Sequence, residues 1–376
     1  MAQPKRILIV RPSALGDVCR TVPVLASLRR AYPQATIDWL VQEDFAAAIR
    51  AHPALDEAVL FPRARFARWW RDPAVAWEML LWFAALGRRG YDLVFDCQGL
   101  GRSGLITWAT FAKHRIGLRS AREFGWLGYT IRLPRSSAKH TVQQMMWLLT
   151  AQDIEPRYDM SLYVADADRT WWTDRRAELG MAGESYVVLA PTSRWPSKRW
   201  PQRSWSALVG PLMARGFGRA ILVGSHTERE QVREIVSREP EVAASLIDLV
   251  GRTSVGQTMA VIADAALVIG NDSAPLHMAV GFARPCLGLY GPTDPQEVGP
   301  YGVDDAVVCI DIGARGESID YKDPGLGNAL MRLIQPADVL GRVDQMFPER
   351  QIALTRPGPC VQGDRGSSTL TERAAS

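Results

Sequence analysis

The chain of 376 residues is long enough for two domains, yet no apolar run reaches the roughly 18 residues of a membrane span. Five scattered cysteines without a Cys-x-x-Cys pair argue against a disulfide framework or a zinc site, and with no signal-peptide core they predict a cytoplasmic protein. The net charge of +4 divides into +8 over residues 1–160 and −4 over the remainder, so the basic half either meets an anionic partner (nucleic acid, phospholipid or a phosphorylated substrate) or is a solvated surface.

Apolar runs that alternate with amphipathic stretches predict an α/β fold in the N-terminal half. Residues 6–10 form the first expected strand, residues 18–33 an amphipathic helix, and residues 35–42 the second strand. Two more strands are predicted at 91–98 and 114–118. Because strands that alternate with helices pair in parallel, we expect one parallel sheet here.

Residues 66–86 stand out by their tryptophan and arginine content. Trp69, Trp70, Trp77 and Trp82 lie in this segment with arginines around them. The segment is either a core-packed helix with a basic rim or an interfacial patch that touches a membrane.

A second strand–helix series begins near residue 185. Its expected strands are 185–191, 219–225, 246–251, 265–271 and 285–292, and its expected helices include 227–239 and 254–265. We therefore predict two doubly wound domains, over residues 1–165 and 183–335, joined by a polar linker. A helix over 336–350 and a disordered tail over 355–376, rich in Pro, Gly and Ser, complete the prediction.

The loops that follow the strands are the expected ligand sites, because open α/β sheets bind ligands beyond the carboxyl ends of their strands. The loop "RPSALGD" ends in Asp17, which either caps the next helix or serves as a general base. The loop "APTSRWPSKRWP" is either an ordinary surface loop or a phosphate site made of Thr192, Ser193 and Lys198. The turn "YGPTDP" adds Thr293 and exposed backbone N–H groups.

The loop "GNDSAPLHMA" leads from a buried strand into a helix. Asp272 and Ser273 are residue types that cap helices, and the free N–H groups of Ser273 and Ala274 favour a pyrophosphate. The charge of Asp272 would repel that anion unless a cation such as Lys198 offsets it. His277 either binds the ligand or holds the loop in place.

One motif supports a different function. The stretch "GLGRSG" (99–104) matches the dinucleotide pattern G-x-G-x-x-G, although it follows a later strand and not the first one. About 20 residues further on, only Glu123 is available to bind a ribose, among several arginines. The alternative function is therefore a nucleotide-sugar epimerase or an NADP-type oxidoreductase on a double-Rossmann scaffold.

Taken together, the loops carry a family resemblance. With "ILIVRPSALGDVCR", "DLVFDCQGLGRSGL", "APTSRWPSKRWP", "VIGNDSAPLHMA" and "LYGPTDP", the chain resembles the lipopolysaccharide heptosyltransferases of glycosyltransferase family 9, from Arg6 to about Phe347. The resemblance implies an inverting enzyme of the GT-B fold, with two Rossmann-like domains that face each other across a cleft. The C-terminal domain would bind a nucleotide-sugar, ADP-heptose in the best-known members, and the N-terminal domain a lipid-anchored phosphorylated glycan such as the lipopolysaccharide inner core.

The resemblance also assigns roles to residues. Asp17 matches the catalytic base and Lys198 the lysine on the donor diphosphate. The other donor-binding positions that it implies are Thr192, Ser193, Glu228, Asp272, Ser273, Ala274, His277 and Thr293. For acceptor phosphates or anionic lipid we expect the basic residues Arg63, Arg65, Arg68, Arg119, Arg122 and Lys139.

The chain departs from the family pattern at two positions near the donor, of which the second leaves the sugar open. Ala274 stands where the family often has Gly, and "WPS" before Lys198 differs from the best-known heptosyltransferases. We expect transfer without a metal or cofactor, because Lys198 and a helix N-terminus can neutralise the leaving diphosphate. We expect no nucleic-acid partner, and peripheral contact at the cytoplasmic face of the inner membrane.

Overall fold

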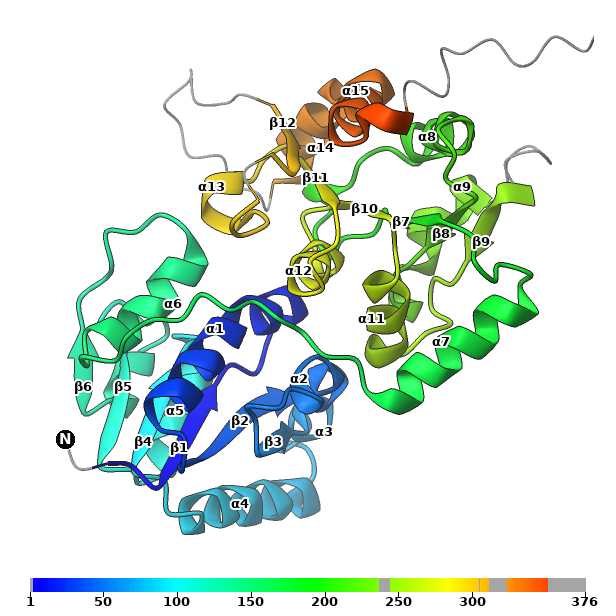
Figure 1. Ribbon diagram of the computed structural model, residues 1–376. Helices are drawn as coiled ribbons and strands as arrows, with labels where there is room; N and C mark the ends of the chain where they lie inside the picture. The colour runs from blue at the N-terminus through cyan, green and yellow to red at the C-terminus, as the bar shows by residue number, and fades with distance from the viewer. Residues whose placement is uncertain (1–2, 237–243, 304, 311–322, 351–376) are drawn as a thin grey trace, which may run out of the picture.

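Two parallel six-stranded sheets, each covered by helices, make up the protein (Figure 1). The computed structural model describes residues 3–236, 244–303, 305–310 and 323–350. The strand order is β3-β2-β1-β4-β5-β6 in the N-terminal sheet and β12-β11-β10-β7-β8-β9 in the C-terminal sheet. Counted within its own half, each order is 3-2-1-4-5-6, the order of a doubly wound nucleotide-binding sheet. The predicted α/β class with two Rossmann-like units is confirmed, whereas the domain boundaries at 165 and 183 remain a prediction.

The N-terminal half builds its sheet around β1, four of whose five residues are buried. Its strands are β1 (Arg6–Val10), β2 (Thr36–Gln42), β3 (Glu57–Phe61), β4 (Leu93–Asp96), β5 (His114–Leu118) and β6 (Ile131–Leu133). Its helices are α1 (Leu15–Ala31), α2 (Ala47–Arg50), α3 (Arg63–Phe66), α4 (Pro73–Arg88), α5 (Gly101–Ala109) and α6 (Thr141–Thr150), with 3-10 turns η1 (Glu43–Phe45) and η2 (Gly125–Gly128). Helices cover both faces of a parallel sheet, so its central strands are apolar runs and do not alternate.

The C-terminal half repeats this plan around β7, β10 and β11, all of which are fully buried. Its strands are β7 (Tyr186–Ala190), β8 (Arg219–Leu222), β9 (Leu246–Asp248), β10 (Leu267–Asn271), β11 (Cys286–Tyr290) and β12 (Val307–Cys309). Its helices are α7 (Asp166–Glu178), α8 (Gln202–Ala214), α9 (Arg233–Val236), α11 (Val255–Ala263), α12 (Ala274–Gly281), α13 (Pro295–Val298), α14 (Pro324–Leu333) and α15 (Pro336–Met346), with 3-10 turns η3 (Pro196–Lys198) and η4 (His226–Val232).

The structure corrects several details of the predicted elements. The polar stretch expected to be a linker is the helix α7, which packs on α11 through the buried Trp172. The indole N–H of Trp172 donates to the Tyr186 hydroxyl at 3.0 Å. The expected helix over 227–239 begins as the 3-10 turn η4 and continues as α9, and its residues 237–239 lie outside the described residues. The short strands β3, β6 and β12 and the helix α14 were not predicted. The expected disordered tail lies outside the described residues.

The two halves meet where α1 packs against α12 (Figure 1). A Cβ built on Gly16 would lie 3.0 Å from Cδ2 of His277 and 3.5 Å from Cα of Ala274. A larger residue at this point would therefore require the His277 ring to move by a few tenths of an ångström. Gly16 of the loop "RPSALGD" thus sets how closely the N-terminal half approaches the start of α12.

Candidate functional site

A cavity of about 490 Å³ lies between the two halves, where the loops after β1, β7 and β10 come together. The strand order reverses next to β1 in the N-terminal sheet and between β7 and β10 in the C-terminal sheet. Doubly wound sheets bind their ligands at such a reversal. Nine of the predicted catalytic and donor-binding residues line it: Asp17, Thr192, Ser193, Lys198, Glu228, Asp272, Ser273, Ala274 and His277. Thr293 is the tenth, and its hydroxyl donates to the cavity residue Asp272 at 3.1 Å.

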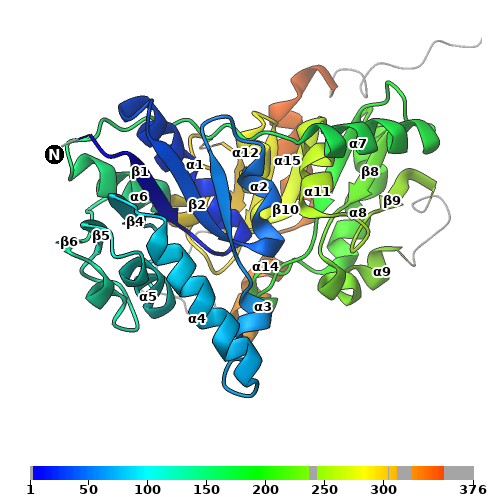
Figure 2. The same cartoon turned by 90° about the horizontal axis from the view of Figure 1, so that it is seen from below.

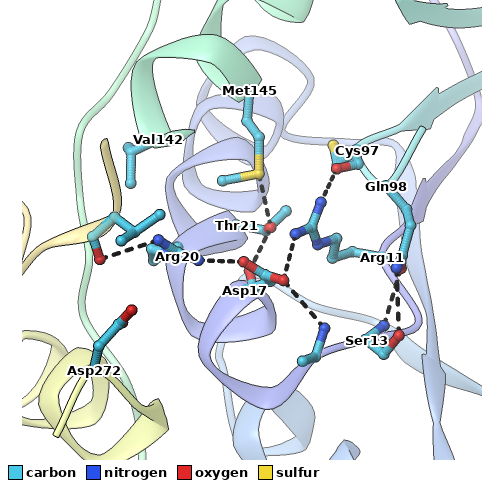
Figure 3. A network of polar contacts seen from close by, with 12 residues as sticks. Arg11, Ser13, Asp17, Arg20, Thr21, Cys97, Gln98, Val142, Met145 and Asp272 are labelled. Carbon is cyan, nitrogen blue, oxygen red and sulfur yellow. Dashed lines mark hydrogen bonds and ion pairs between the residues drawn. The ribbon is translucent and has the colours of Figure 1, made fainter. Parts of the chain in front are cut away.

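Asp17 is held by two arginines on the N-terminal side of the cavity (Figure 3). Nη2 of Arg11 lies 2.8 Å from Oδ2 of Asp17, and Nη2 of Arg20 pairs with Oδ1. The N–H of Ala14 also donates to Oδ2, at 3.3 Å, so the capping role considered for Asp17 is present as well. Burial alone would raise the pKa of the Asp17 carboxyl, but the guanidinium groups of Arg11 and Arg20 outweigh it and hold that pKa well below its usual range.

Arg20 connects this carboxylate to the other half of the protein. Its Nη1 donates to the carbonyl oxygen of Val298, at the end of α13, at 3.1 Å. Its side chain is only 9% exposed and also lines the cavity. Arg20 was not predicted as a site residue, although it lies three residues after Asp17 and therefore on the same face of the helix.

Lys198 and Asp272 form an ion pair on the C-terminal side of the cavity. Nζ of Lys198 lies 2.6 Å from Oδ2 of Asp272, and the two side chains are only 13% and 8% exposed. The cation that the sequence analysis required beside Asp272 is therefore present. The positive charge of Lys198 and the negative charge of Asp272 largely cancel, so this part of the cavity wall carries little net charge.

The polar turn before α12 is built differently from the expected cap. Ser273 is the N-cap residue, yet no side chain caps the helix, and the Ser273 hydroxyl instead donates to the carbonyl of Asn271 at 3.0 Å. The expected capping role of Asp272 is wrong, because its carboxylate accepts bonds from Lys198 and Thr293. Within the described residues, no side-chain cap therefore competes with an anion for the N–H groups that begin this helix.

Asn271 ties this turn to the lysine loop. Its amide donates to the carbonyl of Pro191 at 2.6 Å, and its oxygen accepts the N–H of Trp200 at 3.2 Å. Asn271 is fully buried, so both bonds form away from water. The loop 191–200 that carries Lys198 is thereby held at both ends against the end of β10.

Glu228 lines another part of the cavity wall. Its Oε2 accepts the hydroxyl of Thr192 at 3.1 Å, the N–H of Ser225 at 2.9 Å and the hydroxyl of Ser225 at 2.7 Å. These bonds orient the carboxylate at the beginning of η4. The cavity residues Ser225, Thr253 and Thr258 were not predicted, although Ser225 ends one expected strand and Thr253 follows another. Thr258 lies on α11.

His277 is buried at the floor of the site, 3% exposed. Burial and the charge of Arg20 lower its pKa well below the usual value, so the imidazole is neutral at pH 7. Its Nδ1 is buried without a hydrogen-bond partner in the part of the chain that the structure describes. A neutral imidazole with an unsatisfied ring nitrogen can accept or donate one hydrogen bond to a ligand hydroxyl.

The six basic residues expected to bind the acceptor lie away from this cavity. None of them lines it. Arg65 pairs with Glu78 at 2.6 Å, and Lys139 pairs with Asp294 of the C-terminal half at 2.7 Å. The remaining four are exposed on the N-terminal half: Arg63, Arg68, Arg119 and Arg122. Their proposed role is therefore limited to a surface outside the cavity.

The G-x-G-x-x-G stretch serves packing. A Cβ built on Gly104 would lie 2.2 Å from the carbonyl oxygen of Gly125, and one on Gly128 would lie 2.0 Å from that of Gly104. These glycines let α5 and η2 touch backbone to backbone. The N–H of Gly101 donates to the carboxylate of Glu123 at 3.2 Å, so the helix start already has an anion.

Among the described residues, no group of three or more His, Cys, Asp or Glu side chains could hold a metal ion. In the same part of the chain, no helix has the length and apolar character needed to cross a membrane.

Comparison with known proteins identifies the family. Residues 80–322 match Glycosyltransferase family 9 (heptosyltransferase). The chain belongs to this family. It is 30% identical to lipopolysaccharide heptosyltransferase 1 of Pseudomonas aeruginosa over 306 residues, which cover 79% of this chain and 81% of that protein. It is 28% identical to the Escherichia coli protein of the same name over 307 residues, covering 79% and 91%.

The fold of this chain agrees with its assignment to the family. The structure of E. coli heptosyltransferase WaaC with ADP superposes with a TM-score of 0.70 and 25% identity, covering 92% of this chain and 99% of that chain. The predicted GT-B fold is thus confirmed. The alternative of an epimerase or NADP-type oxidoreductase is not favoured, since the family match and the packing role of Gly104 both count against it.

Proposed function

We propose that the protein transfers a heptose or a related sugar, with inversion, from an ADP-sugar to a lipid-anchored phosphorylated glycan such as the lipopolysaccharide inner core. We place this reaction at the cytoplasmic face of the inner membrane. One observation carries the proposal: a carboxylate of one half, Asp17, and a cation of the other, Lys198, line the same cavity. Inverting transfer needs a base on the acceptor side and positive charge on the leaving-group side.

In the proposed reaction, an acceptor hydroxyl attacks the anomeric carbon of the donor. A new C–O bond forms while the bond between that carbon and the diphosphate oxygen breaks, and ADP leaves. Asp17 takes the hydroxyl proton, a contribution worth about 10²–10⁴ in rate. Lys198 and the N–H groups of Ser273 and Ala274 stabilise the charge that develops on the diphosphate, about 3 kcal/mol for each well-placed donor.

The depressed pKa of Asp17 shapes this step. A carboxylate paired with two arginines is a weak base, so it takes the proton only when the new C–O bond is well advanced. That timing suits a transition state in which the sugar has oxocarbenium character. The two arginines also keep the carboxylate ionised at neutral pH, the state in which it can accept a proton.

The remaining cavity residues fit the donor. We assign the Glu228 carboxylate to ribose hydroxyls, since its Oε2 is held by Thr192 and Ser225 and the group lines the cavity. We assign Thr192 and Ser193 to phosphate oxygens beside Lys198. The neutral His277 is placed to bond a sugar hydroxyl or phosphate oxygen.

The names and bound ligands of the relatives support the proposed donor and acceptor. The matching curated proteins are lipopolysaccharide heptosyltransferases. One E. coli WaaC structure holds ADP and another ADP-2-deoxy-2-fluoro heptose, at 25% identity to this chain. ADP-heptose is thus the donor to test first.

Calorimetry with ADP, UDP, GDP, CDP, NADP and ADP-heptose tests the donor, followed by ADP release with a heptose-deficient lipopolysaccharide acceptor. We expect selective binding of ADP and ADP-heptose that Lys198→Ala weakens, and ADP release that requires the acceptor. Preference for another nucleoside diphosphate would retain the glycosyltransferase and change the donor. Binding of NADP alone would overturn the proposal.

A further inference from the structure

The N-terminal half exposes an apolar surface of its own, away from the cavity. Fifteen large hydrophobic side chains are exposed in the described residues, and ten of them lie between residues 69 and 127. Five of these ten lie on α4 and α5, and Figure 2 shows α4 on the side of the molecule turned toward the viewer. Such clustering is unlike the scattered apolar residues of an ordinary surface.

The helix α4 is apolar on both of its faces. On one face, Trp82 packs edge-on against Phe61 and Phe66, with ring centroids 5.5 and 6.0 Å apart. On the opposite face, Trp77 is 62% exposed and Leu81 50% exposed. A helix with apolar residues all round is normally buried on every side. We therefore expect the outer face of α4 to contact another apolar surface.

The apolar surface continues from α4 onto its neighbours. A Cβ built on Gly87 would lie 3.0 Å from the Phe111 ring, and this ring lies 5.8 Å from that of Trp108. The helix α5, which carries Trp108, packs in turn against η2, where Leu127 is exposed. We call the surface of α3, α4, α5 and η2 the aromatic face.

Basic residues surround this face. Residues 63–132 contain 12 Arg and Lys against 5 Asp and Glu, a net charge of +7. Arg71 lies over the ring of the exposed Trp70, with its guanidinium carbon 4.1 Å from the ring centroid. Arg132 lies over Trp126 in the same way, at 4.8 Å. Tryptophan with arginine at its edge is the combination found at the boundary between lipid headgroups and acyl chains.

We propose that the aromatic face docks on the surface of an anionic phospholipid bilayer. Trp77, Leu81 and Trp108 enter the headgroup–acyl boundary, and the surrounding arginines bind lipid phosphates. A second copy of this chain is disfavoured as the occupant by electrostatic repulsion. Pairing two aromatic faces would bring together two copies of residues 63–132, each with a net charge of +7. The choice of a bilayer also rests on the proposed function, in which the acceptor is lipid-anchored.

The proposal predicts a binding energy with two parts. The apolar part does not depend on salt, whereas the arginine part is screened within about 8 Å at physiological ionic strength. Vesicle binding should therefore be strong with anionic lipid at low salt and weaken, without disappearing, at high salt. A purely electrostatic surface would lose all binding at 1 M salt, which would overturn the insertion of Trp77 and Leu81.

The test is flotation of the full chain with vesicles of phosphatidylethanolamine and phosphatidylglycerol, and with phosphatidylcholine vesicles as the uncharged comparison. We expect the double variant Trp77→Ser/Leu81→Ser to lose about tenfold in partitioning onto anionic vesicles. Arg71→Gln/Arg88→Gln should lose a similar factor at low salt and nothing at 1 M salt. The matched control is Leu326→Ser/Leu333→Ser, two exposed leucines on α14 of the other half, which should float like the parent.

Equal flotation of the parent and Trp77→Ser/Leu81→Ser would overturn the proposal. A parent chain that is dimeric by light scattering, becomes monomeric in that variant and ignores vesicles would show that a second copy covers the face. ADP binding is measured on the same samples and should not change in any of these variants. Failure of flotation with intact ADP binding thus rejects the docking surface alone, and absence of ADP binding in the parent rejects the proposed function alone.

Discussion

The two sides of the cavity share one strand order and do different work. On the N-terminal side, the loop after β1 presents a single carboxylate whose oxygens are occupied by Arg11 and Arg20. On the C-terminal side, the loops after β7 and β10 present a lysine paired with Asp272 and an uncapped helix start. The fold therefore determines where the site lies, and the side chains of the loops determine its chemistry.

The largest effect should come from removing the carboxylate of the N-terminal side. Asp17→Asn keeps the size of the side chain and its acceptor oxygen toward Ala14, but it cannot take a proton. We expect a loss of about 10²–10⁴ in kcat, measured as ADP release with acceptor, and ADP affinity close to that of the parent by calorimetry. An equal loss of ADP affinity would mean that Asp17 shapes the cavity and does not act as the base.

The next effect should come from the C-terminal side. Lys198→Ala removes a charge from the leaving group, so we expect kcat to fall about 10²–10³-fold and ADP binding to weaken. It also leaves the nearly buried Asp272 carboxylate unpaired, which should lower the free energy of unfolding by about 3 kcal/mol. Adding Asp272→Asn should restore the stability without restoring activity, as measured by urea unfolding and ADP release. Recovery of both would reduce Lys198 to a structural partner.

A smaller effect is expected where the two sides are joined. Arg20→Gln removes one of the cations that depress the pKa of Asp17, so that pKa should rise. It also removes a contact that orients the carboxylate, and for this reason kcat should fall by about tenfold. In the parent protein, the lowered pKa keeps Asp17 ionised as the pH falls below the usual range of a carboxyl group. Its ion pairs then still stabilise the folded state, and this stabilisation is lost only at lower pH. In the variant, the acidic limb of the pH–rate profile and the acid unfolding midpoint should both move to higher pH. An unchanged profile would show that Arg11 alone sets the pKa.

The smallest effect is expected from the exposed pair of Lys139 and Asp294. The two side chains are 51% and 39% exposed, so Lys139→Ala should change the free energy of unfolding by less than about 1 kcal/mol. A rise in the KM for the lipid-linked acceptor, with an unchanged KM for the donor, would assign Lys139 to acceptor binding. An unchanged acceptor KM would remove it from that set.

The sequence was informative about the site because parallel strands end on one edge of a sheet. Asp17, Lys198 and Asp272 were each chosen from a loop after an apolar run, and all three line one cavity. Arg20 was within reach of the same reasoning, since it lies one helical turn beyond Asp17. Its contact with Val298, in contrast, joins residues 278 positions apart and has no local signal.

The errors have physical reasons of their own. The stretch near 165–183 looked like a linker because α7 buries a single large residue fully, Trp172, and leaves most of its other side chains in water. The G-x-G-x-x-G pattern looked like a nucleotide site because glycines that approach a phosphate and glycines that approach a backbone carbonyl are identical in sequence. Asp272 looked like a cap because its partners Lys198 and Thr293 are distant along the chain.

The bond between Arg20 and Val298 makes the chemistry sensitive to the distance between the two sheets. One guanidinium group holds Asp17 in the N-terminal half and the Val298 carbonyl in the C-terminal half. Asp17 and Arg20 both lie on α1, so a hinge opening breaks the bond to Val298 and keeps the ion pair, and Arg20 then loses the contact that fixes its orientation from the other half. The carboxylate is therefore oriented most rigidly when the two halves are together, and a closed cleft is also the state that keeps water away from an activated sugar.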